Sequence, residues 1–212
     1  MKLSKKILIS FTLGLCINPA FADQNFFNAT EISAKKGDMT AQYNLGVMYA
    51  NGQGVTQNYS KAFEWYSRAA AQGDADAQYR LGLMYASGQG VTQNYSKAFE
   101  WYSKAAAQGQ ADAQHKLAVM YANGQGVSQN YTKAIEWVSK AANQGDAQAQ
   151  YNLGLMYANG QGVAQNYAKA FEWYSKAAAQ GDASAQTNLG VMYDNGQGVA
   201  QNYAKAFEWY SK

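Results

Sequence analysis

The sequence repeats itself every 36 residues, and this period limits the possible folds more than any other feature. The stretch LGVMYANGQGV begins at Leu45, and close copies begin 36, 72, 108 and 144 positions later. These copies start at Leu81, Leu117, Leu153 and Leu189. A fixed period of this size is typical of solenoids, in which one supersecondary unit buries its apolar face against its neighbours. We therefore predict an array of five units.

The repeat positions divide the chain after residue 22. Full units are predicted over 38–73, 74–109, 110–145 and 146–181, and a shortened fifth unit over 182–212. Residues 23–37 look like a degenerate second half of a unit, with Gly37 in the place of Gly73. Because terminal repeats meet water on one face, they are commonly atypical. We interpret 23–37 as an N-terminal cap helix.

The N-terminus has the pattern of a secretory signal peptide. Three lysines lie within the first six residues, residues 7–17 are mostly apolar, and Ala20 and Ala22 are small residues ahead of a cleavage site. We predict a signal peptide over 1–22 that is cleaved after Ala22, and hence a periplasmic or secreted protein. No later segment approaches the roughly 18 to 20 apolar residues of a transmembrane helix.

Composition excludes several kinds of site from the chain that would remain after cleavage. Cys16 and Pro19 are the only cysteine and proline, and both lie in the predicted leader. The remaining chain can therefore form neither disulfides nor thiolate sites. The formal charge of +3 also belongs to the leader, which holds three lysines and no acidic residue. A neutral remainder offers no electrostatic attraction for nucleic acid or an anionic membrane.

Each unit is predicted to be an antiparallel pair of helices. In the first helix of unit one, the apolar positions follow i, i+4, i+7, i+8 spacing behind Asp38 and stop at Gly52. Asp38 can cap the first turn, and Gly52 can close the last one in a left-handed conformation. These apolar positions are Ala41, Leu45, Met48 and Tyr49.

The second helix is predicted to begin after Asn58 and to end before Gly73. Its apolar face holds Tyr59, Ala62, Trp65, Tyr66, Ala69 and Ala70. On the opposite, solvated side, Glu64 and Arg68 have the i, i+4 spacing of a surface ion pair, and every later unit has an equivalent pair.

These residues carry a family resemblance. The pattern A-x-x-x-L-G-x-M-Y-x-x-G-x-G-V, followed by K-A-x-x-W-Y-x-x-A-A-x-x-G, resembles the Sel-one-like repeat, a relative of the tetratricopeptide repeat. The resemblance implies an all-α fold, a right-handed α-solenoid of antiparallel helix pairs, that acts as an adaptor for protein–protein interaction. Many bacterial members are exported. A cysteine-rich branch has been associated with β-lactam binding or hydrolysis, but this chain lacks its paired cysteines.

The first helix of each unit also carries residues on the face opposite its core positions. By resemblance to tetratricopeptide-like arrays, these positions line a concave groove, and Tyr is enriched among interface hot spots. The alternative is that they pack against the preceding unit. The two ladders are Tyr43, Tyr79, His115, Tyr151 and Thr187, and Val47, Leu83, Val119, Leu155 and Val191.

The third unit departs from the pattern at five places. Gln110 replaces Asp, His115-Lys116 replaces Tyr-Asn or Tyr-Arg, Ala118 replaces Gly, and Ile135 and Val138 replace Phe and Tyr. One hypothesis makes His115 and Lys116 the specificity centre of the groove. The other is compensated substitution, in which Ala118 adds a methyl where Val138 and Ile135 remove ring volume.

Three hypotheses for function follow. The leading one is a scaffold that binds a protein or peptide through its concave surface. The second is a hydrolase acting on cell-wall or β-lactam substrates, suggested by the cysteine-rich branch alone. The third is self-assembly through the uncapped repeat 182–212, which would give a homo-oligomer. His115 is the only histidine, so we expect no metal, no cofactor and no catalytic triad.

Overall fold

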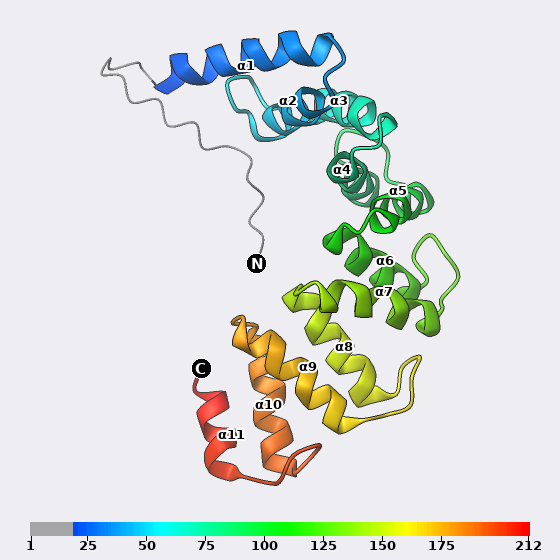
Figure 1. Ribbon diagram of the computed structural model, residues 1–212, viewed down its shortest axis with the longest axis vertical. Helices are drawn as coiled ribbons and strands as arrows, with labels where there is room; N and C mark the ends of the chain where they lie inside the picture. Colours follow the sequence, from blue (N-terminus) through cyan, green and yellow to red (C-terminus); the bar gives the residue numbers. More distant parts are fainter. Residues whose placement is uncertain (1–18) are drawn as a thin grey trace.

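The computed structural model describes residues 19–212, with side chains from residue 23, and this part of the chain contains eleven helices and no strand. Most of the predicted signal peptide, 1–22, lies outside the described residues. The helices are α1 (Pro19–Lys35), α2 (Met39–Asn51), α3 (Tyr59–Ala71), α4 (Ala75–Ser87), α5 (Tyr95–Ala107), α6 (Ala111–Asn123), α7 (Tyr131–Asn143), α8 (Ala147–Asn159), α9 (Tyr167–Ala179), α10 (Ala183–Asn195) and α11 (Tyr203–Tyr210). They follow one another along an open arc (Figure 1). The predicted fold class, an all-α solenoid of helix pairs, is confirmed.

The helix ends lie where the capping residues predicted them. The Asp38 side chain accepts a hydrogen bond from the backbone N–H of Ala41, and Gly52 closes α2 with a φ of 72°. Asn58 caps α3 by accepting from the N–H of Lys61 at 2.9 Å. The same caps recur in every later unit, and Gln110 takes the role of Asp38 at the start of α6.

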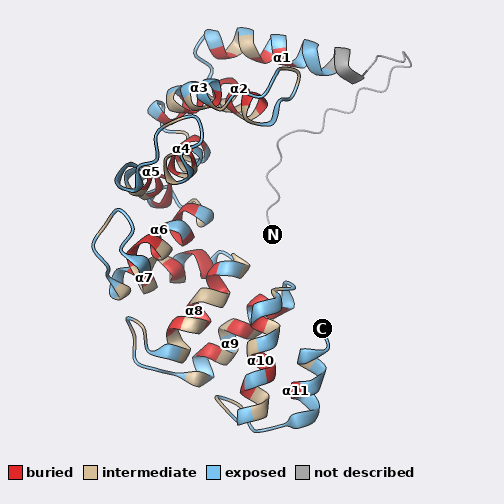
Figure 2. Ribbon diagram, turned by 180° about the vertical axis from the view of Figure 1, so that it is seen from behind, coloured by how far each residue is buried: buried red, intermediate tan, exposed pale blue. Residues whose placement is uncertain are grey.

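The core runs along the array in the space between helices rather than in one central cluster. Figure 2 shows buried residues on the sides where neighbouring helices meet. Small residues at the helix contacts let the backbones approach closely: Ala62, Ala98, Ala134 and Ala170 are completely buried. The large residues at the centre of each pair are Leu45, Leu81, Leu117, Leu153 and Leu189, each at most 1% exposed.

Buried glutamines join consecutive units. The Gln78 amide nitrogen donates to the carbonyl oxygen of Ala70 at 3.2 Å, across the turn between α3 and α4. Its carbonyl oxygen accepts from the amide nitrogen of Gln108, at the end of α5, at 2.8 Å. Gln42, Gln114 and Gln150 make the same two contacts in their units. Since both ends of the amide are used, these polar groups can be buried without losing hydrogen bonds.

The prediction of an ion pair between Glu64 and Arg68 is wrong. Among the described residues, the ion pair of permanently charged side chains within 4 Å is Glu31 with Lys35, and the His115 ring lies 3.9 Å from Asp146. The Arg68 guanidinium lies instead over the indole ring of Trp65, 4.3 Å from its centre. The lysines of later units do the same, because a cation three residues after a tryptophan can lie over the ring face.

Helix α1 packs as the second helix of a unit. Phe27 of α1 contacts Tyr49 edge-on, with 5.6 Å between ring centres. Phe63 of α3 makes the same edge-on contact with Tyr85, at 5.4 Å. At the other end of the arc, α11 is the least covered helix, and its Phe207 is 73% exposed.

Candidate functional site

Pockets recur at three consecutive junctions between units, and each is built in the same way. The first helix of one unit forms one wall, the first helix of the next unit forms the other, and a residue of the intervening second helix lies at the floor. We name them the proximal pocket (α4, α5 and α6), the central pocket (α6, α7 and α8) and the distal pocket (α8, α9 and α10). Their volumes are about 280, 330 and 280 Å³ respectively.

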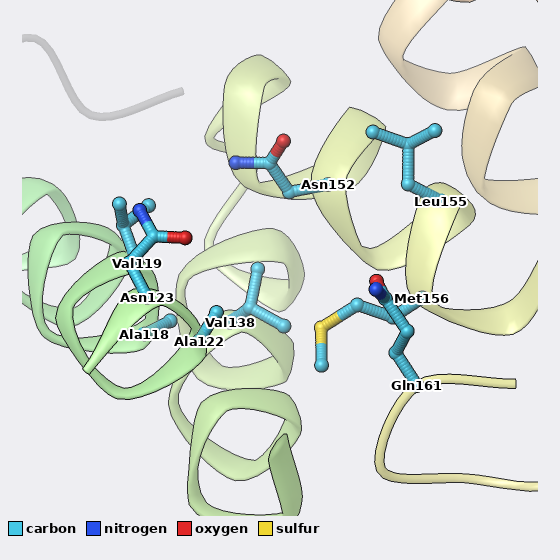
Figure 3. A pocket seen from close by; sticks show the side chains of 9 residues that line it. All are labelled: Ala118, Val119, Ala122, Asn123, Val138, Asn152, Leu155, Met156 and Gln161. Carbon is cyan, nitrogen blue, oxygen red and sulfur yellow. The ribbon is translucent and has the colours of Figure 1, made fainter. Parts of the chain in front are cut away.

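The central pocket shows the arrangement (Figure 3). Ala118, Val119, Ala122 and Asn123 of α6 lie on one side, Asn152, Leu155 and Met156 of α8 lie on the other, and Val138 of α7 lies between them. Gln161 reaches the rim from the loop after α8. The floor residues of the proximal and distal pockets are Tyr102 and Tyr174.

The helical period explains why the wall residues face these openings. Leu153 is buried in the core, and Leu155 lies two residues later, about 200° further around α8. Leu155 is therefore turned away from the core and lines both the central and the distal pocket. Val119 has the same position on α6 and lines the proximal and central pockets. Adjacent pockets thus share a wall.

The structure brings five of the predicted site residues to the pockets. Leu83, Lys116 and Val119 line the proximal pocket, Val119 and Leu155 the central pocket, and Leu155 and Val191 the distal pocket. Val47, the first member of the same ladder, is half-buried on α2 beside the core cluster of the first units.

The tyrosines of the other ladder pack against the floor residues instead. Tyr79 contacts Tyr102 and Tyr151 contacts Tyr174, with ring centres 5.9 and 5.8 Å apart. Tyr43 contacts Tyr66 in the same tilted geometry, at 5.8 Å. Burial raises the pKa of the Tyr66, Tyr102 and Tyr174 hydroxyls above the usual range. The pairs at Tyr102 and Tyr174 hold the floors of the proximal and distal pockets in place, whereas Tyr66 lines none of the three pockets.

His115 and Thr187 replace tyrosine in this ladder and behave differently. His115 is buried, and the Asn152 amide nitrogen lies 2.7 Å from its Nε2. Because an amide nitrogen only donates, Nε2 accepts, and the proton of the neutral ring is on Nδ1, 3.9 Å from Oδ1 of Asp146. Burial lowers the pKa of His115 against the opposing effect of Asp146. Thr187 is exposed and bonds to the carbonyl oxygen of Ala183.

Two substitutions of the third unit, Ala118 and Val138, meet at the central pocket. A Cβ atom built on Gly154 would lie 2.6 Å from two ring carbons of Tyr174, so the tyrosine floor requires glycine there. In the third unit, Val138 stands in the place of that tyrosine, and Ala118 in the place of that glycine. Ala118 then becomes part of the pocket wall. This geometry agrees with the hypothesis of compensated substitution, since Val138 and Ala118 are both buried, at 1% and 3% exposure.

The sequence did not predict the polar side chains at the rims of the pockets. Asn152 and Asn188 line the central and distal pockets, and loop glutamines contribute to all three rims. The repeated Gly-Gln-Gly loops were the feature of the sequence that could have indicated these glutamines. These loops are held close to the array, because a Cβ on Gly126 would collide with the carbonyl oxygen of Tyr95. The glutamines of the Gly-Gln-Gly loops are Gln125, Gln161 and Gln197, and Gln165 of the loop after α8 also lines the distal pocket.

No group of three or more His, Cys, Asp or Glu side chains in residues 23–212 is placed to hold a metal ion. None of the helices from α1 to α11 is both long and apolar enough to cross a membrane.

The most similar solved structures include two with long, close superpositions. One is a protective antigen present in uropathogenic Escherichia coli strains, which displays an SLR fold; it is 41% identical with a TM-score of 0.85 over 87% of this chain. This chain spans 40% of that protein. The other is a Sel1 repeat protein from Oxalobacter formigenes, 34% identical with a TM-score of 0.84, covering 90% of this chain and 80% of its own.

A Sel1 repeat protein of Klebsiella pneumoniae matches less closely, at 28% identity and a TM-score of 0.55 over 86% of this chain and 89% of its own. No curated protein matches the chain. The Sel1 repeat model matches five segments that cover most of the sequence: 40–74, 75–110, 111–146, 147–182 and 183–212. With five matched repeats and a solenoid shared with solved Sel1 repeat proteins, the chain belongs to the Sel1 repeat family.

Proposed function

We propose that this protein is a binding scaffold that holds an extended segment of a partner protein across the proximal, central and distal pockets. Sel1 repeat proteins generally bind other proteins and are generally not enzymes. The observation that carries the proposal is the row of pockets itself. Adjacent pockets share the walls formed by Val119 and Leu155, so they form a continuous series rather than separate sites.

The chemistry of the pocket walls suits a peptide. Apolar side chains such as Leu83, Leu155 and Met156 can bury the side chains of a ligand, and the rim amides can bond to its backbone. Pockets with mostly apolar walls and a few polar groups are typical binding sites. Adjacent pockets share a wall, so an extended segment, which advances about 3.3 Å per residue, passes from one pocket to the next within a few residues.

The proposal places the scaffold outside the cytoplasm. Residue 23 stands 36 positions before Tyr59, the first residue of α3, so 23–35 has the register of a second helix in a repeat. Cleavage after Ala22 would leave a helix that begins where the other second helices begin. Phe27, which packs on Tyr49, would be retained. The leader pattern and this register together support export.

A peptide-display selection tests the scaffold proposal. Random peptides are selected on the protein, and the affinities of the recovered peptides are measured against Val119→Gln/Leu155→Gln, which changes the shared walls. Ile135→Gln is the matched control, since Ile135 is also half-buried and apolar but lines none of the three pockets. We expect the wall variant to lose at least about tenfold in affinity, equivalent to roughly 1.4 kcal/mol, and the control to retain binding.

The opposite pattern would refute the proposal. If selected peptides bind the wall variant as tightly as the parent protein, they are held elsewhere on the array. Circular dichroism and denaturant midpoints of both variants show whether a loss of binding comes from the pocket wall or from unfolding.

A further inference from the structure

His115 links the two walls of the central pocket. It lies on α6, and the amide nitrogen of Asn152 on α8 lies 2.7 Å from its Nε2. Asn152 lines the central pocket, whereas His115 is buried and lines none of the three pockets. The side chain that contacts His115 is therefore also one that a ligand in the central pocket meets.

The equivalent link two units earlier is made by groups that keep their charge near neutral pH. Arg80 and Tyr43 stand 72 positions before Asn152 and His115. Against the effect of burial, contact with the Tyr43 hydroxyl raises the pKa of Arg80. Arginine and tyrosine titrate well above about pH 8, whereas an ordinary histidine titrates near 6.5. At the central pocket, the same kind of link therefore becomes sensitive to mild acid.

The neutral ring fixes the orientation of the Asn152 amide. Nδ1 of His115 faces a carboxylate oxygen of Asp146 at 3.9 Å, so the ring proton is on Nδ1, and Nε2 accepts from Asn152. Figure 3 shows the Asn152 nitrogen turned toward α6 and its oxygen turned away from that helix. With a neutral ring, the carbonyl oxygen of Asn152 is thus free to accept a hydrogen bond from another group.

A proton on Nε2 reverses this arrangement. The new N–H of the ring would face an N–H of the Asn152 amide, and two donors cannot bond to each other. The amide has to turn over, so that its oxygen accepts from His115 and its nitrogen takes the place that the oxygen had. The wall of the central pocket then offers a donor where it offered an acceptor. Asp146 remains beside the imidazolium, 3.9 Å from Nδ1.

Charged groups reach His115 from its own helix and from the start of α8. Burial lowers the pKa of His115, and Asp146, which caps α8, opposes this shift. On α6, Lys116 lowers the pKa further and Asp112 raises it. The pKa remains below the usual value of 6.5, so the ring is neutral at about pH 7.5 and takes its proton in acid.

The other helices packed around the ring present neutral groups to it. On α4, Tyr79 is influenced by the same two carboxylates, Asp112 and Asp146, and it packs on Tyr102 of α5. Burial raises the pKa of both tyrosines, so they stay uncharged. On α7, the residue at the pocket floor is Val138. The two lysines of α7 lie over aromatic rings: Lys133 over Tyr121 and Lys140 over Trp137.

We propose that His115 sets the hydrogen-bonding character of the central pocket through Asn152: with a neutral ring the pocket accepts a hydrogen bond from the partner, and with a protonated ring it donates one. This inference rests on the proposed scaffold function and names a positioning residue for it. A backbone N–H of an extended segment fits the neutral state. The affinity for such a segment falls when the ring takes its proton.

The test follows peptide affinity and the state of the ring over the same pH range, from about pH 8 to about pH 4.5. Peptides are selected at about pH 7.5 from a library without His, Asp or Glu and with blocked termini, so that the protein alone titrates. Nitrogen NMR reports the ring, and its signals need no assignment because His115 is the only histidine. The Asn152 amide signals are followed in the same samples.

The parent protein should lose about three- to tenfold in affinity, the size of one hydrogen bond, with the midpoint at which His115 titrates. The ring should carry its proton on Nδ1 above that midpoint, and the Asn152 amide signals should shift with it. In His115→Gln, the side-chain oxygen can accept from Asn152 but takes no proton, so the ratio of affinities at the two ends of the range should be near one. Asn152→Asp has no N–H to turn away and should also lose the pH dependence.

Several results would overturn the inference while the scaffold proposal stands. These are an affinity that does not change as His115 titrates, an Nε2–H tautomer in the neutral ring, an Asn152→Asp variant that keeps the full pH dependence, and a ring that stays neutral until circular dichroism shows unfolding. If His115→Gln does not fold, the agreement of the two midpoints in the parent decides. If no peptide is recovered at any pH, the scaffold proposal fails, whereas a shift of the Asn152 amide at the His115 midpoint still supports the link between ring and pocket.

Discussion

Gly154 and Tyr174 are matched so closely that the glycine cannot be replaced while the ring stays in place. A Cβ on Gly154 would lie 2.6 Å from Cδ1 and Cε1 of Tyr174. The same pairing holds for Gly46 and Tyr66, also at 2.6 Å. Only where the ring is replaced by valine, at position 138, does the chain carry alanine opposite it.

Restoring the ring alone should therefore destabilise the third unit. Val138→Tyr introduces a ring against the Ala118 methyl, and such overpacking typically costs about 1–3 kcal/mol. Adding Ala118→Gly should recover most of that loss, with a coupling of about 0.5–3 kcal/mol in the double-mutant cycle. Denaturant unfolding of the parent, both single variants and the double variant measures it. Strictly additive effects would show that the two positions do not pack against each other.

Stability should depend on pH through His115. Burial lowers the pKa of His115 below its usual value of 6.5, so the unfolded chain binds a proton at a higher pH than the folded chain does. Because stability rises with pH wherever the unfolded state binds more protons, the contribution is complete above about pH 6.5 and is lost as the pH falls below it. Asp146 and Asp112 act against this shift, and Lys116 acts with it.

The comparison is made with His115→Tyr, which carries the residue of the neighbouring units. The loss of unfolding free energy between about pH 7 and about pH 5 should be larger in the parent than in this variant, since model histidines titrate near 6.5. Equal losses would mean that His115 has the same pKa in the folded and unfolded chains.

Removing a glutamine link between units should lower the free energy of unfolding. In Gln114→Leu, the carbonyl oxygen of Ala106 and the amide of Gln144 each lose a partner. A buried polar group left without a partner costs about 1–3 kcal/mol, and we expect a loss of that size in urea unfolding.

Gln186→Leu is the matched control for this link. The Gln186 amide is less buried and lies 3.4 Å from the carbonyl oxygen of Ala178. Its replacement should cost less than that of Gln114. If the two substitutions cost the same, the effect reflects the change of side chain rather than the link between units.

Substitutions at two loop glycines should distinguish the cost of backbone strain from the cost of a steric clash. Gly109 and Gly126 both have positive φ angles, 89° and 68°, where an alanine costs about 1–2 kcal/mol. A Cβ on Gly109 meets nothing within 4 Å, whereas one on Gly126 collides with the Tyr95 backbone. We expect Gly126→Ala to lower the melting temperature clearly more than Gly109→Ala. Equal shifts would indicate that the loop can move away from α5.

The predicted cleavage site can be tested by determining the N-terminal residue of the exported protein. If residues 1–22 are removed on export, mass spectrometry of the exported protein should give a chain that begins at Asp23. Replacing Ala20 and Ala22 by leucine should block this cleavage, because small residues are needed at the site. An exported chain that retains the leader would contradict the prediction.

The helices could be predicted from the sequence because their determinants are local. Asp38, Gly52 and Asn58 act within one turn of the helix ends that they define. The apolar period selects the buried face of each helix, and Leu45 and its equivalents are the core residues that it indicates. The 36-residue repeat then predicts a solenoid, since each unit needs a neighbour to cover its apolar face.

The pockets depended on the tertiary structure, because each is formed by side chains from three helices and a loop. Sequence spacing placed Tyr151 and Leu155 on one face of their helix, but only the packing of α9 shows that Tyr151 supports the floor while Leu155 lines the opening. Likewise, the sequence places Arg68 within reach of both Glu64 and Trp65, and in the structure its guanidinium lies over the ring of Trp65. The repeat determined which positions are equivalent, and contacts between units decided what each position does.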